Sequence, residues 1–384
     1  MTYDEIIQSC RELLELLPEQ ALERAREKRP DLKAFGVFPV YAPVEIIHAA
    51  GLLPVGFFGV GTKLEISHAD SRFQSFICSI AKSTLELFLR GETKGFEGAV
   101  FSSICDVARN LASLIKRNTA GMYVEYLHLP QNMSSAESLR YTQAEFDRFR
   151  ANLGKQLGCS IPIAAIGRSL DLYNRIRSLT RGLYRHRREH PGSIGAAELA
   201  AVTQAGSRMM PEDFIPLLEA LSEEVRDRHG HPRDSVDVVI EGAFCEQPPP
   251  ALIETIESAG CQVKDDDLVL GWRWFRENPI SNGDPLQALA KAYLETSVYS
   301  SVRHDGRSPR TLGLLKRVEE SGAQAVVFTP AKFCEPALLD YVPFRQTLDA
   351  HKIPHLKLEF EEKMWTFEAS RTEVETFAES MLFD

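Results

Sequence analysis

The sequence predicts an α/β protein with two Rossmann-like or flavodoxin-like parallel-sheet domains and a helical segment between them. Short apolar strand candidates alternate with helical segments up to residue 130 and again after residue 233, which is typical of βαβ units. The region between them has amphipathic helical periodicity and few strand signals. The length of 384 residues suffices for about two or three domains. We therefore expect domains at 1–141, 142–232 and 233–384.

The first α/β domain is expected to contain strands that end at proline, glycine or serine. The strand candidates, with their turns, are 33–43, 52–59, 96–103 and 123–130. Helical spacing covers 1–30, 44–51, 73–90 and the stretch after Cys105. Because helices separate the strands, we expect a mostly parallel sheet.

The middle segment and the second α/β domain follow the same reasoning. Amphipathic helices are expected at 144–158, 169–190 and 210–228. Strand signals then return at 236–244, 261–267, 323–330 and 354–360. The helices between and before them are expected at 250–260, 284–297, 311–322 and 334–351.

Charge and hydropathy exclude two classes of partner. The net charge of -10 argues against general nucleic-acid binding, which needs a basic surface. No apolar stretch reaches the roughly 18 residues that would span a bilayer. The first residues, MTYDEIIQSCRELLELL, lack the cationic start and apolar middle of a signal peptide. We expect a cytoplasmic protein without nucleic-acid or membrane partners.

Three segments share a pattern that points to a common site. Each has an apolar strand, a short loop, a cysteine followed directly by an acid, and then a helix; the cysteines are Cys105, Cys245 and Cys334. Ligands bind at the carboxyl ends of parallel strands, and a helix N-terminus stabilises a thiolate. The pattern predicts that these thiols meet in one cleft, which Cys78 in the first domain could also reach.

The spacing of the cysteines limits the kind of site they can form. Zinc ribbons and ferredoxin motifs use ligands two to four residues apart, so only the fold could gather these thiols. An iron-sulfur cluster usually takes about four thiolates, and a site with three leaves one iron open. For any single cysteine, burial for packing alone is the alternative. We expect such a buried structural role for Cys10, Cys159 and Cys261.

Polar residues after the first strand form a second group of candidates. Tyr41 and Glu45 lie at a proline-bounded strand end, and His48 follows on an apolar helical stretch. This turn could contribute polar groups to the same cleft as the thiols. The alternative for His48 is a hydrogen-bonded histidine in the core.

The stretch KDDDLVLGWRWFREN combines acids with aromatic and basic residues. Trp272, Arg273 and Trp274 could stack on or clamp a planar anionic ligand, or become buried at a subunit interface. The acids at 265–267 are expected in a solvated turn.

An arginine-rich helix in the middle segment could face phosphates or an acidic partner. A solvated helix face is the stronger expectation for its arginines. They are Arg175, Arg177, Arg181, Arg185, Arg187 and Arg188.

Taken together, these segments resemble the 2-hydroxyacyl-CoA dehydratase and benzoyl-CoA reductase family. The matching stretches span both α/β domains and are FPVYAPVEIIHAAGLLPVGFFG, FQSFICSIAKSTLELFLRG, VFSSICDVARNL, VVIEGAFCEQPP, VKDDDLVLGWRWF and VVFTPAKFCEPALLDY. Within the family they look most similar to the smaller of the two substrate-side subunits of ATP-dependent benzoyl-CoA reductase.

The resemblance implies an iron-sulfur subunit of an enzyme of anaerobic aromatic catabolism. Such an enzyme reduces the aromatic ring of benzoyl-CoA to a cyclohexadiene-carbonyl-CoA by low-potential single-electron transfer. By resemblance, Cys78, Cys105 and Cys334 are the metal ligands of one [4Fe–4S] cluster, whereas Cys245 matches a family segment without being a ligand. The implied partners in a cytoplasmic heterotetramer are a homologous second substrate-side subunit and an ATPase pair. Ferredoxin would be the indirect electron donor, and an aromatic acyl-CoA the substrate.

Two alternatives remain open from the sequence. The chain could be a subunit of a 2-hydroxyacyl-CoA dehydratase, which eliminates water through a radical and shares the cluster site. It could instead be a non-catalytic zinc or thiol protein. No residue is identified as the proton donor.

Overall fold

The computed structural model describes residues 1–39, 41–59, 63–230, 234–242, 245–268, 274–297, 309–361, 364 and 366–383. Two four-stranded sheets, each with all strands parallel, form its framework. Their strand orders, β2-β1-β3-β4 and β6-β5-β7-β8, are equivalent, so the two sheets share one doubly wound topology. The predicted fold class of two parallel-sheet units is confirmed.

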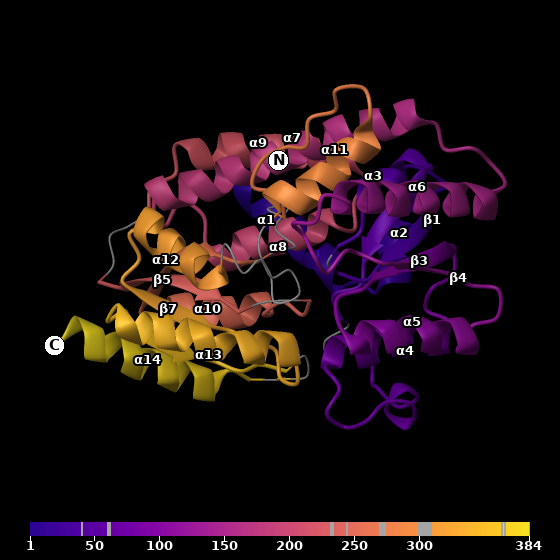
Figure 1. The fold of residues 1–384 in the computed structure, drawn as a ribbon. Helices are drawn as coiled ribbons and strands as arrows, with labels where there is room; N and C mark the ends of the chain where they lie inside the picture. Colours follow the sequence, from indigo (N-terminus) through magenta and orange to yellow (C-terminus); the bar gives the residue numbers. More distant parts are fainter. Residues whose placement is uncertain are drawn as a thin grey trace.

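The first sheet lies on the right in Figure 1, between helices of the N-terminal part. Its strands are β1 (Lys33–Val37), β2 (Leu52–Gly56), β3 (Phe96–Ser102) and β4 (Tyr123–Leu127). The N-terminal helices are α1 (Tyr3–Glu15), α2 (Pro18–Arg26), α3 (Val44–Ala49), α4 (Ser79–Arg90) and α5 (Asp106–Asn118), with a short 3₁₀ turn, η1, at Ala69–Ser71. The central strands β1 and β3 are mostly apolar and buried, as expected of a sheet covered on both faces.

The second sheet lies at the left of Figure 1. They are β5 (Val236–Glu241), β6 (Cys261–Asp266), β7 (Ala325–Phe328) and β8 (His355–Lys357). The helices of this part are α10 (Pro250–Ser258), α11 (Pro285–Lys291), α12 (Arg310–Ser321), α13 (Glu335–Ala350) and α14 (Glu368–Leu382), with one π-helical turn, η3, at Ala292–Thr296. The C-terminal helix α14 was not among the expected elements.

Between the sheets, residues 138–226 form four helices. They are α6 (Ser138–Leu157), α7 (Ile163–Glu189), α8 (Ala196–Gly206) and α9 (Pro211–Arg226). Helix α1 packs against this layer, since Ile6 shares a buried cluster with Leu199 and Phe214. None of the helices that the structure describes is long and apolar enough to cross a bilayer. The expected domain limits stay a prediction.

Buried ion pairs join the helical layer to the two sheets and correct two expectations. Arg187 on α7 donates to Asp266 on β6 at 3.0 Å, and both side chains are buried. Arg177, nearer the start of α7, pairs with buried Glu45 on α3. The prediction of a fully solvated arginine face is wrong, and so is that of a solvated turn at Asp265 and Asp266. Opposite charges compensate one another inside the protein, which a single segment of sequence does not reveal.

The helix expected at 73–90 begins only at Ser79, and this places Cys78 at its N-terminus. Cys78 has an extended backbone with ψ of 145°, and it is the N-cap of α4. At the other end, Gly91 closes the helix in a left-handed conformation with φ of 72°. The apolar spacing of the residues before Cys78 reflects packing of Phe73 and Ile77 against the core and not a helical turn.

Candidate functional site

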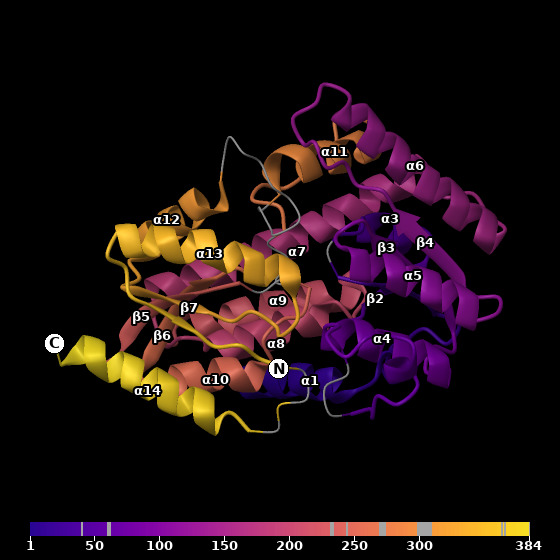
Figure 2. The ribbon, with the colours of Figure 1, turned by 60° about the horizontal axis from the view of Figure 1, so that its bottom comes forward.

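Three helices begin directly after a cysteine, and two of them, α5 and α13, closely follow the ends of β3 and β7. Cys78, Cys105 and Cys334 are the N-caps of α4, α5 and α13. In both ribbon views, one end of α13 in the second α/β unit faces the ends of α4 and α5 in the first (Figures 1 and 2). The strand-end positions predicted from the sequence thus bring residues of the two sheets to the same region.

The thiols lie close enough to change one another's acidity. Burial raises the pKa of Cys78, and the charges of Glu246 and Cys334 raise it further. Burial likewise raises the pKa of Cys334 to about 12, with Cys105 adding to the effect. The pKa of Cys245 is raised well above its usual value by burial and then by the charges of the other three thiols. The charges of Cys78, Cys105, Cys245 and Cys334 thus act on one another, and we call these four residues the thiol group.

Backbone geometry around two of the thiols is specialised. The Cys105 Sγ accepts the N–H of Ala108 at 3.5 Å, an interaction that favours the thiolate at a helix start. Phe333, which precedes Cys334, is held at φ of 62°, in the left-handed region that costs a non-glycine residue about 1–3 kcal/mol. The N–H of Lys332 donates to the Phe360 carbonyl at 2.8 Å and helps to fix this turn.

Glu246 connects the two α/β units beside the thiol group. Its carboxylate is buried and accepts the backbone N–H of Ile80, in the first turn of α4, at 3.2 Å. Glu246 also borders a cavity of about 530 Å³, whose other walls include Phe58 and Phe360. In the sequence, this residue stands out only as the acid after Cys245. The repeated cysteine–acid pattern was the signal that could have identified it.

No three histidine, cysteine, aspartate or glutamate side chains in the described part of the chain are arranged to hold a single metal ion. The remaining cysteines lie elsewhere. Cys10 and Cys261 are buried, in agreement with packing roles, whereas Cys159 is exposed and the expectation of a buried side chain is wrong there.

Of the three pocket candidates, Tyr41 contacts the end of the strand that leads to Cys105. Its N–H donates to Ser102 Oγ at 3.1 Å, at the end of β3. Glu45 instead pairs with Arg177 on α7. His48 Nδ1 lies 2.8 Å from Ser169 Oγ, and its Nε2 lies 3.1 Å from Glu212. The structure therefore directs Glu45 and His48 toward the helical layer.

Aromatic rings surround Tyr41. Its ring stacks on Trp274 and Tyr293, with centroids 5.4 and 5.3 Å away, and meets Phe275 edge-on. The hydroxyl of Tyr41 and the Nε1 of Trp274 are buried and have no hydrogen-bond partner among the described residues. Trp274 thus contributes to the stack, whereas Trp272 and Arg273 lie outside the described residues.

The fold has two similar parallel sheets, and helices that begin after cysteines extend from both. It defines a class of α/β proteins in which both halves of one chain contribute cysteines to the candidate site. The model of the family "2-hydroxyglutaryl-CoA dehydratase, D-component" matches residues 39–381, and the chain belongs to this family.

Individual relatives cover nearly the whole chain. It is 34% identical over 382 residues to a subunit of the benzoyl-CoA reductase of Thauera aromatica, covering 99% of each chain. It is 28% identical over 361 residues to the (R)-2-hydroxyglutaryl-CoA dehydratase subunit beta of Acidaminococcus fermentans, covering 93% of this chain and 94% of the relative. A similar match, 29% over 350 residues and 91% of each chain, is to lactoyl-CoA dehydratase subunit beta of Anaerotignum propionicum.

Proposed function

We propose that this chain is the iron-sulfur subunit of an ATP-dependent benzoyl-CoA reductase. The observation that carries the proposal is the thiol group, in which Cys78, Cys105 and Cys334 each cap the N-terminus of a helix. Similarity to one subunit of a benzoyl-CoA reductase over 99% of both chains supports the reaction.

The three N-cap thiols are the proposed ligands of a [4Fe–4S] cluster. Each thiolate binds a different iron, so the ligands need only surround a common space. Helix N-termini stabilise the thiolate charge, and burial withdraws the site from water. When bound, such a cluster supplies single electrons at low potential. The Ala108 N–H on Cys105 Sγ would remain as a hydrogen bond to a ligand sulfur, which tunes that potential.

Cys245 is proposed as a neighbour of the cluster and not as a ligand. The charges of the three proposed ligand thiols add to the effect of burial on its pKa, but Cys245 belongs to the loop after β5 and caps no helix. With three cysteine ligands, the fourth iron would be left for a group other than cysteine.

Tyr41, Glu45 and His48 are proposed to line or support the acyl-group pocket. Tyr41 has a buried hydroxyl without a partner among the described residues, and its backbone N–H contacts Ser102 at the end of the strand that leads to Cys105. Glu45 and His48 would act by holding the turn against α7 and α9. An aromatic acyl-CoA fits a pocket with stacked rings.

A complete enzyme of this kind would need further chains. We propose a homologous second substrate-side subunit and an ATPase pair that receives electrons from ferredoxin, all in the cytoplasm. The relatives are themselves designated as subunits, which supports assembly with other chains.

The test of the reaction is an anaerobic assay of the complex with reductant, ATP and either benzoyl-CoA or a 2-hydroxyacyl-CoA. Formation of a cyclic diene thioester, with ATP consumed in proportion to the diene formed, supports the reductase. Water elimination from the hydroxyacyl thioester, with no diene from benzoyl-CoA, would establish the second candidate, a dehydratase subunit. The dehydratase subunits among the relatives favour keeping that candidate. A colourless protein that contains only zinc would overturn both.

A further inference from the structure

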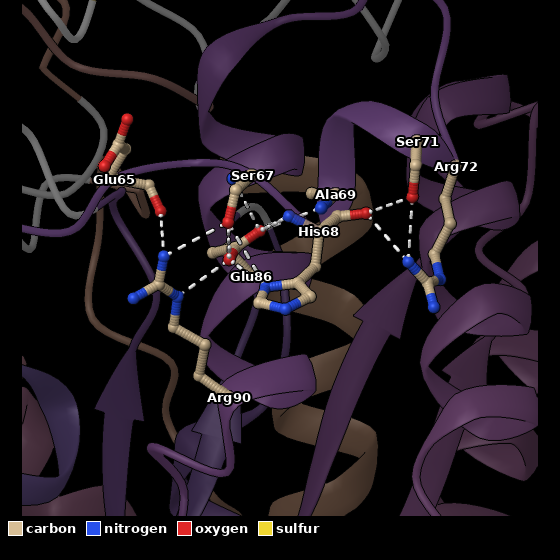
Figure 3. Close-up of polar contacts among 8 residues, drawn as sticks. All are labelled: Glu65, Ser67, His68, Ala69, Ser71, Arg72, Glu86 and Arg90. Carbon is tan, nitrogen blue, oxygen red and sulfur yellow. Dashed lines mark hydrogen bonds and ion pairs between the residues drawn. The ribbon is translucent and has the colours of Figure 1, made fainter.

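The segment that leads into Cys78 lies along one face of α4. Lys82, Glu86 and Arg90 are spaced four residues apart, so they project from the same face of this helix. All three contact the preceding segment at residues 65–75, which we call the strap. Figure 3 shows the contacts that Glu86 and Arg90 make with it.

Glu86 is the centre of these contacts. Its Oε2 accepts the backbone N–H groups of Ser67, His68 and Ala69 at 3.2, 2.8 and 2.8 Å. Its Oε1 lies 2.8 Å from His68 Nδ1 and accepts from Arg90 Nε at 2.8 Å. The carboxylate is buried, and although burial opposes ionisation, these hydrogen bonds lower the pKa of Glu86 to about 2. One ionised side chain therefore satisfies three consecutive N–H groups of the strap.

Lys82 and Arg90 hold the two ends of the strap. The Arg90 Nη2 donates to the Glu65 carbonyl at 2.7 Å. The Lys82 Nζ lies 3.0 Å from the Asp70 carboxylate and donates to the Ser75 carbonyl at 3.4 Å. Lys82 is one helical turn beyond Cys78, so the same turn of α4 that carries the thiol also holds the chain just before it.

The strap has few other fixed points close to Cys78. Residues 70–76 are exposed except for half-buried Phe73, and the Phe76 side chain is 59% exposed. Phe73 and Ile77 pack against the core from this stretch. Arg72 Nε also donates to Asn118 Oδ1 at the end of α5, at 3.3 Å. The path of the backbone into Cys78 thus depends on Phe73 and Ile77, on this exposed contact and on the three polar residues of α4.

We propose that Lys82, Glu86 and Arg90 are positioning residues that fix the strap and, through it, the Cys78 thiol. The importance of that thiol as a ligand rests on the proposed function, but its placement does not. Without the negative charge of Glu86, three backbone N–H groups and Arg90 lose their ionised acceptor, and the strap opens locally. The Cys78 thiol then becomes accessible more often than Cys105 or Cys334.

The experiment measures alkylation of each cysteine by iodoacetamide, followed by peptide mass spectrometry. It uses the full-length chain, purified without oxygen and stripped of metal with a chelator. We compare the wild type with Glu86→Gln, which keeps the size of the side chain but removes its charge. The expected result is about a tenfold faster reaction at Cys78, with Cys105 and Cys334 unchanged.

Glu145→Gln is the matched control. Glu145 is also buried, accepts the His128 N–H at 2.7 Å and pairs with Arg148, but it holds the loop after β4. It should leave the Cys78 rate unchanged. If Glu86→Gln does not fold, Lys82→Met tests the same strap and is expected to accelerate Cys78 alone.

An unchanged rate at Cys78 in the folded variants would overturn the proposal, and so would an equal acceleration at all three cysteines. Iron analysis of the wild type before chelation separates this result from the proposed function. A protein without iron would remove the cluster assignment, while the alkylation rates would still decide the role of the strap.

Discussion

Individual residues of the thiol group differ in what they are expected to do. Cys78, Cys105 and Cys334 cap helices, whereas Cys245 shares their surroundings without capping one. We predict that serine at any of the three capping positions abolishes most iron binding. Cys245→Ser should retain it, with Cys261→Ser on β6 as the distant control. Iron content per chain after anaerobic purification is the measurement, and iron loss in Cys245→Ser equal to that in Cys105→Ser would contradict the ligand assignment.

The buried pair of Arg177 and Glu45 joins α7 to α3. Both side chains are at most 5% exposed, so losing Arg177 would leave a buried charge uncompensated. We predict that Arg177→Met lowers the free energy of unfolding by about 3–5 kcal/mol. Arg175→Met, which removes a half-exposed pair with Glu219, should cost no more than about 1 kcal/mol. Chemical denaturation measures the free energy of unfolding of the two variants. Equal decreases would show that the buried pair stabilises the fold no more than the half-exposed pair does.

Sequence reasoning at the scale of residues works best where one segment holds the whole signal. The strand–loop–cysteine–acid–helix pattern singled out Cys105, Cys245 and Cys334, whose charges act on one another in the structure; their role as a site stays a prediction. It failed for Arg187 and Asp266, because each charge is explained only by a partner 79 residues away. The contact of Glu246 with Ile80 also could not be predicted from a single segment, because it joins the two α/β units.

Among the elements, α4 has the clearest dependence on pH. The folded-state pKa of Glu86 is lowered from 4.5 to about 2, so its ionised form stabilises the fold above pH 4.5. This stabilisation is lost as the pH falls through 4.5 toward 2. At about 1.4 kcal/mol per pKa unit, it amounts to roughly 3 kcal/mol at neutral pH.

We therefore predict that the stability difference between the wild type and Glu86→Gln is largest near neutral pH and narrows on acidification. Thermal unfolding of the metal-free chain from pH 7 downward tests this. A difference that stays constant with pH would mean that the carboxylate charge does not hold the strap.

Element types were largely predictable, and element limits less so. Each of the eight strands in the described part of the chain overlaps an expected strand. The signal is clearest in β3, β5 and β7, which are mostly apolar because they are buried on both faces. The start of α4 at Ser79 was missed, since Phe73 and Ile77 have helical spacing but pack from an irregular segment. Helix α8, nearly all alanine and other small residues, offered no polar face to mark its period.

At the scale of the whole molecule, the two sheets share one apolar core. Buried residues of β3, such as Val100, and of β5, such as Val238, belong to the same cluster. We predict that the metal-free chain unfolds in one calorimetric transition. Two separated transitions would show that the α/β units are stable independently and that the thiol group lies between separable domains.

The shared core also explains how the site is built. Cys78 and Cys334 are far apart in the sequence, so they can meet only if the two sheets are held in fixed relative positions. The common core and the Glu246–Ile80 contact hold them in this way. Neither α/β unit alone contains all three proposed ligands. The site is therefore a property of the complete chain.

Iron and acid-labile sulfide analysis of the anaerobically purified wild-type chain tests the central claim most directly. We predict a brown protein with about four irons and four sulfides per chain. A colourless protein, or one with zinc and no sulfide, would contradict the cluster assignment.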